Sequence, residues 1–563
     1  MLQTVFGGKR WLLMLLLVLA AFGTYKDSLH NAFAIWDDDT LVYENPLTQR
    51  ITLENVAGAF TSYDPELYVP ATIVSFQIEH ALFGFNAFNF HLDNLLLHII
   101  AACLGMLLLE RLGLRQGTAF FAALLFTVHP LNTEAVAWVS ARKDLFAGVF
   151  SLSSALAYLS YRDGNRRFLW ISIGFFVLAL LSKPVSIVLP FALLLLDWKE
   201  TGKIRRADWT GKIPFFALSA IFLIIGIYGK QRNLAALSLL ETLLLAVKST
   251  VFSLEKFFLP TALSPIYLQT NPISITQSEF LVPVGIVITA LAIIFLIPKK
   301  GGKCSAPVKA IMFASMWYAV FLVPSFANFD KDHSVYFFSD RYIYLSQIGI
   351  FFLLGFAIDT YVLTDHGKVR RAALMLMTAG IAGLFSWGAH AQSLLWKDSE
   401  TLYRDSLRKN DRSVIMHYNL GLLEQKRGNR DAAFAEYQKV LSLDPDDWKT
   451  LTNLGMWYNE EGDRTKAMEY LQRAADIAPT SPLVHSNIGV VLMDQGDTDG
   501  AIAAFRKAIV ASERFAQAHI NLAAALGRKE LYEEALREYK RAYELVPELL
   551  NDLPDVRRAL ESF

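Results

Sequence analysis

Eleven apolar runs separated by short polar segments occupy the first 391 residues, and they constrain the fold more than any other feature of this sequence. Hydrophobic residues make up 53% of the 563 residues, a share too large for an ordinary soluble protein. Beyond about residue 391 the chain becomes charged and holds no long apolar stretch. We therefore predict an all-α protein, with a membrane-embedded domain over residues 1–391 followed by a soluble helical part.

The apolar runs predict about eleven spans: 10–25, 92–109, 117–128, 145–161, 168–181, 185–196, 213–228, 280–297, 308–323, 342–360 and 372–389. The first is interpreted as a retained span rather than a signal peptide. Several are shorter than the roughly 20 residues that a bilayer demands, so tilt or re-entrant geometry must compensate. Lys and Arg gather at alternate span ends, which predicts the cytoplasmic side. The segment 239–259 is then expected to lie flat on the outer face as an amphipathic helix.

The charged C-terminal part repeats with a period of 34 residues. Asn-Leu-Gly or a close variant recurs with its first residue at Asn419, Asn453, Asn487 and Asn521. Small residues and large apolar residues keep the same period, as they do in tetratricopeptide repeats, where small residues allow two antiparallel helices to approach. We predict a connecting helix or half repeat over 392–413, four repeats over 414–549 and a capping helix over 550–563. The four asparagines are expected to line a groove that accepts an extended polypeptide.

Three adjacent carboxylates, Asp37, Asp38 and Asp39, follow the first apolar run. Because like charges repel, such a group beside a membrane is either kept wet or used on a cation, a proton or a polar acceptor. The alternatives are a solvated acidic turn and a helix N-cap. Asp38 and Asp39 could also bind Mg²⁺ or Mn²⁺ through oxygen ligands, although no metal or other cofactor is required by the sequence.

Further polar residues fall on the same predicted membrane face as the three carboxylates: His129, Glu134, Arg142, Lys143, Lys183 and Arg341. Carboxylates beside several cations suit a reaction in which a base deprotonates a hydroxyl while cations hold a phosphate leaving group. Each of these residues has an alternative role. The three cations before residue 200 could reach toward lipid headgroups, and Arg341 could pair with Asp340. Glu134 could face water, and His129 could be a packing or hydrogen-bonding residue.

Several function classes lack support in this sequence. The net charge is zero, so nothing indicates nucleic-acid binding. The two cysteines, Cys103 and Cys304, are far apart, so a disulfide framework or cysteine metal site is not predicted. Phosphate-binding loops, dinucleotide fingerprints and serine-elbow motifs are missing from the sequence.

The sequence resembles a known family in four motifs and in its repeats. The motifs are the acidic pair Asp37-Asp38, the run Phe90 to His98, the run His129 to Leu145 and the run Asp340 to Leu345. Together they resemble the transmembrane and tetratricopeptide repeat-containing O-mannosyltransferases. This resemblance implies the C-type glycosyltransferase (GT-C) fold and a polyprenyl-phosphate-linked sugar donor. Val69 stands before Pro70 where that family usually has Arg, and the short repeat array and scarcity of cysteine are more typical of a bacterial member.

The resemblance also implies residue roles. Asp37 or Asp38 would be the base for the acceptor hydroxyl, or would orient it. Arg142, Lys143, Lys183 and Arg341 would hold the lipid phosphate, and His129 and Glu134 would shape the pocket.

The leading hypothesis is an inverting membrane glycosyltransferase that moves a sugar, with mannose favoured, from a polyprenyl phosphate to hydroxyls of exported proteins. Its active site and repeats would face the bacterial periplasm, or the lumen of the endoplasmic reticulum in a eukaryote. One alternative is a non-catalytic scaffold that recruits partners through its repeats. Another is a transporter of lipid-linked sugars, which would require ionisable residues at mid-membrane and inverted repeats that this sequence does not display.

Overall fold

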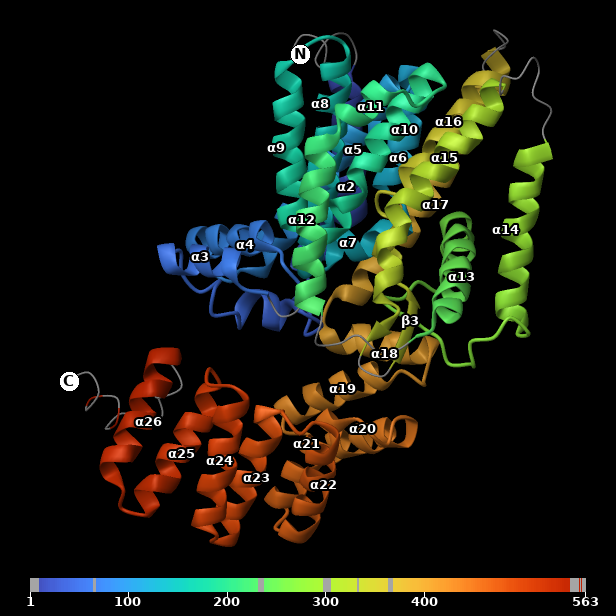
Figure 1. Ribbon diagram of the computed structural model, residues 1–563. Helices are drawn as coiled ribbons and strands as arrows, with labels where there is room; N and C mark the ends of the chain where they lie inside the picture. Colours follow the sequence, from blue (N-terminus) through green and yellow to red (C-terminus); the bar gives the residue numbers. More distant parts are fainter. Residues whose placement is uncertain are drawn as a thin grey trace. The chain divides into compact units, whose positions relative to one another are not determined.

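The computed structural model describes residues 10–63, 67–230, 237–296, 305–331, 334–362 and 368–546, together with 556 and 558. The chain divides into two compact units, residues 1–409 and 410–563, and both are built mainly from helices (Figure 1). The predicted all-α class is therefore confirmed in its main feature. The predicted capping helix over 550–563 lies outside the described residues except at 556 and 558.

Each of the eleven apolar runs of the first unit is helical over most of its length. The long helices are α2 (Arg10–Tyr25), α5 (Ala87–Arg111), α6 (Gln116–Thr127), α8 (Arg142–Arg162), α9 (Arg167–Ser182), α10 (Leu189–Thr201), α12 (Ile213–Lys230), α14 (Ser278–Leu296), α15 (Ala306–Leu322), α16 (Gln347–Ala357) and α17 (Lys368–Ser393). Local sequence sets their ends. Helix α10, for example, has Pro190 in its first turn and stops at Gly202, which adopts the left-handed conformation (φ 71°) that favours glycine.

Four helical segments are long and apolar enough by themselves to cross a membrane: Arg10–His30, Ala87–Arg111, Ala306–Ala327 and Ala372–Leu394. A fifth candidate is the pair Gln116–Thr127 and Pro130–Ala137, which is bent by 56° at its break. Among the described residues, length and composition therefore identify four or five spans rather than eleven. The other apolar helices are shorter or carry more charge.

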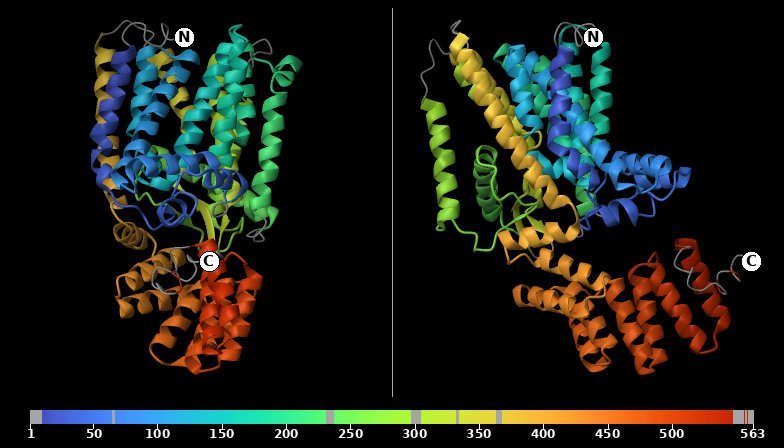
Figure 2. Two further views of the ribbon diagram at one scale, coloured as in Figure 1. Left: turned by 90° about the vertical axis from the view of Figure 1, so that its left-hand side faces the viewer. Right: turned by 180° about the vertical axis from the view of Figure 1, so that it is seen from behind.

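Helix α13 (Leu239–Phe258) starts with a capping box in which Ser238 and Glu241 bond each other's backbone. It was expected to lie flat on the outer face, but it runs alongside α14 instead (Figures 1 and 2). The short helices α3 (Leu53–Thr61) and α4 (Pro70–Phe83) lie across the axes of α8 and α9 (Figure 1).

A small antiparallel sheet was not anticipated from the sequence. Its strands are β1 (Tyr267–Leu268), β2 (Asp330–Lys331) and β3 (Ser334–Phe338), in the order β1-β3-β2. The sheet joins two loops that are about 70 residues apart in the chain, and such long-range pairing is not encoded in local periodicity.

Short helices connect these elements around one end of the long helices: η1 (Lys26–His30), η2 (Asp39–Tyr43), η3 (Pro130–Asn132), α7 (Thr133–Ala137), η4 (Val139–Ala141), η5 (Pro184–Val188), η6 (Val323–Asn328), η7 (Asp340–Ile343), η9 (Leu394–Trp396) and α18 (Ser399–Lys409). At the other end lie α11 (Arg206–Thr210) and η8 (Ile358–Val362).

The second unit consists of four helix pairs at the predicted period. They are α19 (Val414–Lys426) with α20 (Arg430–Leu443), α21 (Trp448–Glu460) with α22 (Arg464–Ile477), α23 (Pro482–Gln495) with α24 (Thr498–Ala511), and α25 (Ala516–Arg528) with α26 (Tyr532–Leu545). A Cβ atom at Gly489 would lie 2.4 Å from the Phe505 ring. Gly421 and Gly455 are equally tight against their partner helices. Glycine therefore sets the close approach within these pairs.

Candidate functional site

The acidic loop is organised by Asp38, which is fully buried. One carboxylate oxygen accepts the Ala34 N–H at 2.8 Å, and the other accepts the Ser140 N–H at 2.9 Å and the Ser140 hydroxyl at 2.5 Å. Burial raises the pKa of Asp38 to about 7, although these hydrogen bonds lower it. Asp38 thus ties the acidic loop to η4, directly before the first turn of α8.

Asp37 remains accessible beside that first turn. Its carboxylate lies 3.7 Å from the Lys143 ammonium, and 37% of its side chain is exposed, compared with 7% for Lys143. Two adjacent aspartates therefore have different surroundings: Asp38 holds the loop in place, while Asp37 presents an oxygen to the surface next to a cation. Such a carboxylate can accept a proton from a hydroxyl group.

The indole of Trp138 brings two cations together. The Lys143 ammonium lies 5.1 Å from its ring centroid, and the Arg341 guanidinium carbon lies 4.9 Å from it. Both distances are typical of cation–π contact. Residues from two distant parts of the chain, the start of α8 and η7, therefore meet over one buried tryptophan.

Glu134 holds Arg341 in place. Its carboxylate pairs with the Arg341 guanidinium and also accepts the Arg341 backbone N–H at 3.0 Å. The Ser339 hydroxyl donates to the same carboxylate at 3.1 Å. Arg341 therefore pairs with Glu134 and not with Asp340, and Glu134 is buried rather than facing water.

A third cation, Lys183, joins the group from the end of α9 and pairs with Asp144. Burial lowers the pKa of Lys183, and the nearby Arg341 and Lys143 lower it further, whereas Asp144 raises it. Lys183 is therefore close enough to Lys143 and Arg341 for their charges to act on it, and each of the three cations also has a carboxylate partner.

Three polar atoms around these cations are buried and, within the described part of the chain, have no hydrogen-bond partner: Arg341 Nε, Asp144 Oδ2 and Trp138 Nε1. Unsatisfied buried polar atoms are unusual in a folded protein. Two of them are donors, so a bound anion or sugar could satisfy them.

Arg142 occupies a different environment from the other predicted donor-binding cations. It is 1% exposed and pairs with Glu79. It also donates to Asn94 Oδ1 at 3.0 Å and to the Phe90 carbonyl at 2.9 Å. The structure thus places Arg142 where α4, α5 and α8 meet, rather than over Trp138.

His129 is also buried and engaged. Its Nδ1 accepts the Leu131 N–H at 3.2 Å, so Nε2 carries the hydrogen that it donates to the Phe257 carbonyl at 3.1 Å. The ring stacks on Phe257 and contacts Phe385 edge-on. The structure therefore places His129 in an aromatic packing site.

The residues suggested for a metal do not form a ready ligand set. Both oxygens of Asp38 accept hydrogen bonds from the protein, so ligation by Asp38 would require these bonds to break. Throughout the described ranges, no three His, Cys, Asp or Glu side chains are grouped closely enough to hold a metal ion.

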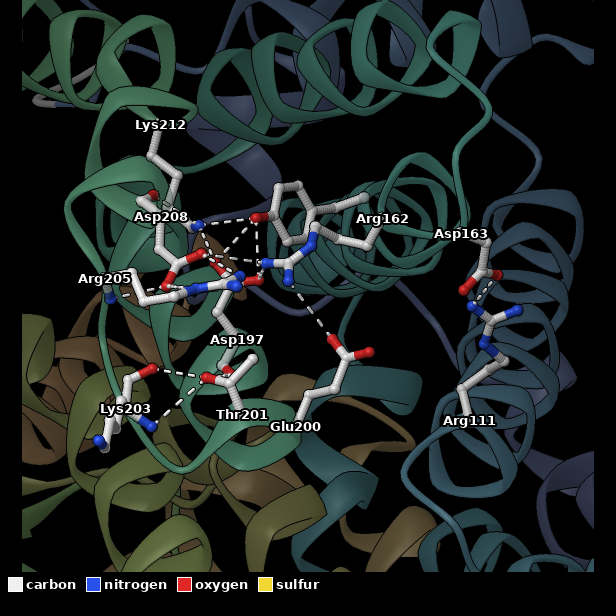
Figure 3. Close-up of polar contacts among 11 residues, drawn as sticks. Arg111, Arg162, Asp163, Asp197, Glu200, Thr201, Lys203, Arg205, Asp208 and Lys212 are labelled. Carbon is white, nitrogen blue, oxygen red and sulfur yellow. Dashed lines mark hydrogen bonds and ion pairs between the residues drawn. The ribbon is translucent and has the colours of Figure 1, made fainter.

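A second ionic cluster lies at the opposite end of α8 (Figure 3). Asp197 is buried, accepts the Tyr158 hydroxyl at 2.9 Å, and pairs with Arg162 and Lys212. Lys143 is in the first turn of α8 and Arg162 is its last residue. A helix of 21 residues is about 30 Å long, which matches the hydrocarbon thickness of a bilayer. The two clusters are therefore separated by one membrane thickness.

The predicted groove asparagines occupy equivalent half-buried positions on the first helix of each repeat. Asn453 donates to the Tyr437 hydroxyl at 3.3 Å, and Asn521 donates to the Ser486 hydroxyl at 3.1 Å. Among the described residues, the side chains of Asn419 and Asn487 make no hydrogen bond. Amide groups with spare bonding capacity are available along this face for a polypeptide backbone.

Sequence reasoning missed Trp138 and Ser140 as contributors to the site. Trp138 lies within a motif that the sequence singles out, and it stands four residues before Arg142. Its role is visible only when Arg341 is brought over the same ring. A tryptophan among polar residues at a span end was the available signal, although interfacial tryptophans are common for other reasons.

This chain is similar to known proteins both in its repeats and over most of its length. The family profile described as tetratricopeptide repeat matches residues 389–447, 418–482 and 487–549. Protein O-mannosyl-transferase F38B6.6 of Caenorhabditis elegans is 25% identical over 77% of this chain and 63% of its own length. The resemblance predicted from the sequence is confirmed. The chain is similar over most of its length to proteins named protein O-mannosyl-transferase, and it carries tetratricopeptide repeats.

Two vertebrate proteins of the same name support this likeness. Mouse protein O-mannosyl-transferase TMTC3 is 23% identical over 77% of this chain and 51% of its own length. Human protein O-mannosyl-transferase TMTC4 is 25% identical over 66% and 57%. The chain thus spans between about half and two thirds of the length of these relatives. A crystal structure of MamA aligns with 26% of this chain and 80% of its own at 24% identity and a TM-score of 0.23, which is too low to support an argument.

Proposed function

We propose that this protein is an integral-membrane glycosyltransferase that moves a sugar from a polyprenyl-phosphate carrier to hydroxyl groups of exported proteins. Mannose is the favoured sugar because the relatives are named protein O-mannosyl-transferases. The observation that carries the proposal is the placement of Lys143 and Arg341 over Trp138, next to the accessible carboxylate of Asp37, with Lys183 close enough for their charges to act on it. An anion site beside a base is what transfer from a sugar phosphate to a hydroxyl requires.

In the proposed reaction the acceptor hydroxyl attacks the anomeric carbon of the sugar. Its proton passes to Asp37, a new carbon–oxygen bond forms, and the bond from the anomeric carbon to the phosphate oxygen breaks. The electron pair leaves with the polyprenyl phosphate. One displacement inverts the anomeric centre, and no covalent enzyme intermediate is needed.

The cations would act on the leaving group. Negative charge grows on the phosphate as its bond to the sugar breaks, and fixed positive groups stabilise that charge more in the transition state than in the ground state. Arg341 offers a planar set of donors, whereas Lys143 and Lys183 act as point charges. Asp38 would hold the loop in place and so keep the Asp37 carboxylate in position. Arg142 and His129, which the sequence also predicts at the donor site, would stabilise the helices around the pocket without contacting the donor.

We further propose that the first unit is a GT-C bundle in which all eleven apolar helices enter the bilayer. The ionic cluster at the far end of α8 would mark the cytoplasmic side, because basic residues concentrate there. The Asp37 site and the repeats would then face the periplasm of a bacterial inner membrane. The groove asparagines would hold the acceptor polypeptide through its backbone.

The test is transfer by the purified full-length protein in nanodiscs, from radiolabelled polyprenyl-phosphate-mannose to a mixture of exported proteins. The key variant is Asp37→Asn. Its matched control is Asp163→Asn, which also removes an exposed carboxylate paired with a cation, Arg111, at the far end of the bundle. We expect Asp37→Asn to lower the transfer rate at least about a hundredfold, as loss of a general base does, and Asp163→Asn to retain it.

Equal activity of the two variants would remove Asp37 from its proposed role. If the native protein labels no acceptor from any polyprenyl-phosphate sugar, although it binds the lipid, the enzyme proposal fails. The scaffold hypothesis would then be preferred, and it predicts that changes at Asn453 and Asn487 disrupt partner recruitment.

A further inference from the structure

The segment between the last apolar helix and α18 is attached to the acidic loop. Three hydrogen bonds join them: Asn31 Nδ2 to the Ser393 carbonyl at 3.2 Å, Ala32 N–H to the Lys397 carbonyl at 2.9 Å, and Ile35 N–H to the Ser399 hydroxyl at 2.8 Å. The last of these lies between Ala34, which is bonded to Asp38, and Asp37. The loop that carries the exposed carboxylate is therefore held at two points, by Ser140 through Asp38 and by Ser399 through the backbone of Ile35.

The same segment also packs on the cation site. The Trp396 ring stacks on Trp138 with centroids 5.8 Å apart and planes 23° apart, and each residue is 1% exposed. Trp138 in turn contacts Lys143 and Arg341. Because the rings are closely packed and buried, a change in the position of Trp396 must move Trp138 or leave a void.

We infer that residues Ser393–Ser399 are a positioning element of the proposed donor site, acting through Trp396 on the cations over Trp138 and through Ser399 on the Asp37 loop. This inference rests on the proposed function. The segment continues into α18, whose last residue, Lys409, is the end of the first compact unit. The part of the chain that connects the repeats therefore also holds the site in register.

Two variants separate the two contacts. Ser399→Ala removes the acceptor of the Ile35 N–H, and its control is Ser406→Ala, because Ser406 is also buried on α18 and its hydroxyl has no partner among the described residues. We expect Ser399→Ala to lower kcat about tenfold, because small displacements of a catalytic group are costly, with the donor KM within about twofold. Ser406→Ala should leave both unchanged.

Trp396→Phe keeps an aromatic ring but reduces its contact with Trp138. Its control is Trp387→Phe on α17, where 72% of the side chain is exposed. We expect Trp396→Phe to weaken binding of undecaprenyl phosphate, which serves as the probe, about fivefold, since the cations would be displaced from one another. Trp387→Phe should bind it as the native protein does.

A readout without substrate separates this inference from the proposed function. Hydrogen–deuterium exchange of a peptide covering residues 31–39 should be faster in Ser399→Ala than in both Ser406→Ala and the native protein. If exchange rises as expected but the native protein neither binds the lipid nor transfers sugar, the positioning role of Ser399 stands and the proposed function fails. Equal exchange in the two serine variants overturns the inference, and so does equal kcat in both when the native protein transfers sugar.

Discussion

Breaking the buried pair of Arg142 and Glu79 should destabilise the fold far more than it changes donor binding. Both side chains are almost completely buried, with 1% and 2% exposed. Removing one member of such a pair leaves an uncompensated charge, at a cost of about 3–5 kcal/mol. We therefore expect Arg142→Met and Glu79→Leu each to lower the free energy of unfolding by roughly this amount.

The double variant provides the decisive comparison. Arg142→Met also leaves Asn94 Oδ1 and the Phe90 carbonyl without their donor, which adds about 1–3 kcal/mol. In the double variant no buried charge remains, so its total loss should be at least about 3 kcal/mol smaller than the sum of the two single losses. Phe76, whose ring lies 4.7 Å from the guanidinium carbon, offers apolar surface to the new methionine.

The assay is denaturant-induced unfolding of the full-length protein in micelles, followed by tryptophan fluorescence, with undecaprenyl phosphate binding measured on the folded fraction. If the two single losses in the free energy of unfolding add up to the loss in the double variant within about 0.5 kcal/mol, the coupling is refuted. A donor affinity that falls with Arg142→Met in folded protein, by as much as with Arg341→Met, would show that Arg142 acts on the donor and would overturn its placement as a supporting residue.

Three further outcomes are expected. Gly489→Ala should lower the unfolding temperature of the repeats, because the new methyl group would overlap Phe505 at a cost of about 1–3 kcal/mol, whereas Gly527→Ala, which has open space, should not. Burial raises the pKa of Asp38 from 3.8 to about 7, so the folded state keeps a proton that the unfolded chain releases. The free energy of unfolding measured by titration should then fall from about pH 4 to pH 7, by about 4 kcal/mol from this group, and Asp38→Asn should remove that slope. Asn487→Ala should raise the KM for an acceptor polypeptide without changing the KM for the donor, and a change in the donor KM alone would contradict the groove assignment.

Much of the fold could be read from local patterns. The 34-residue period predicts the four helix pairs, and the pairing of Gly489 with a large residue on the next helix explains the close approach that the structure displays. Apolar runs predict the helices of the first unit because burial in a bundle and burial in lipid require the same composition. The number of spans does not follow from such patterns, because short or charged helices can be covered by protein.

The candidate site could be predicted only as a set of residue types. The sequence selects Lys143 and Arg142 together, but adjacent residues on a helix point about 100° apart. One of them faces Trp138 and Asp37, while the other is enclosed with Glu79. For Arg341 the sequence left open a pair with its neighbour Asp340, whereas the structure pairs Arg341 with Glu134.

The sequence by itself determined which segments are helical, where the repeats begin and which charged residues stand near a membrane surface, because periodicity and hydropathy act over a few turns of chain. Only the tertiary structure decided that Trp138 collects cations from two distant segments and that Trp396 stacks behind it. These contacts depend on how the helices pack. A helix direction or a loop closure a few ångströms different would separate the same residues without changing any local pattern.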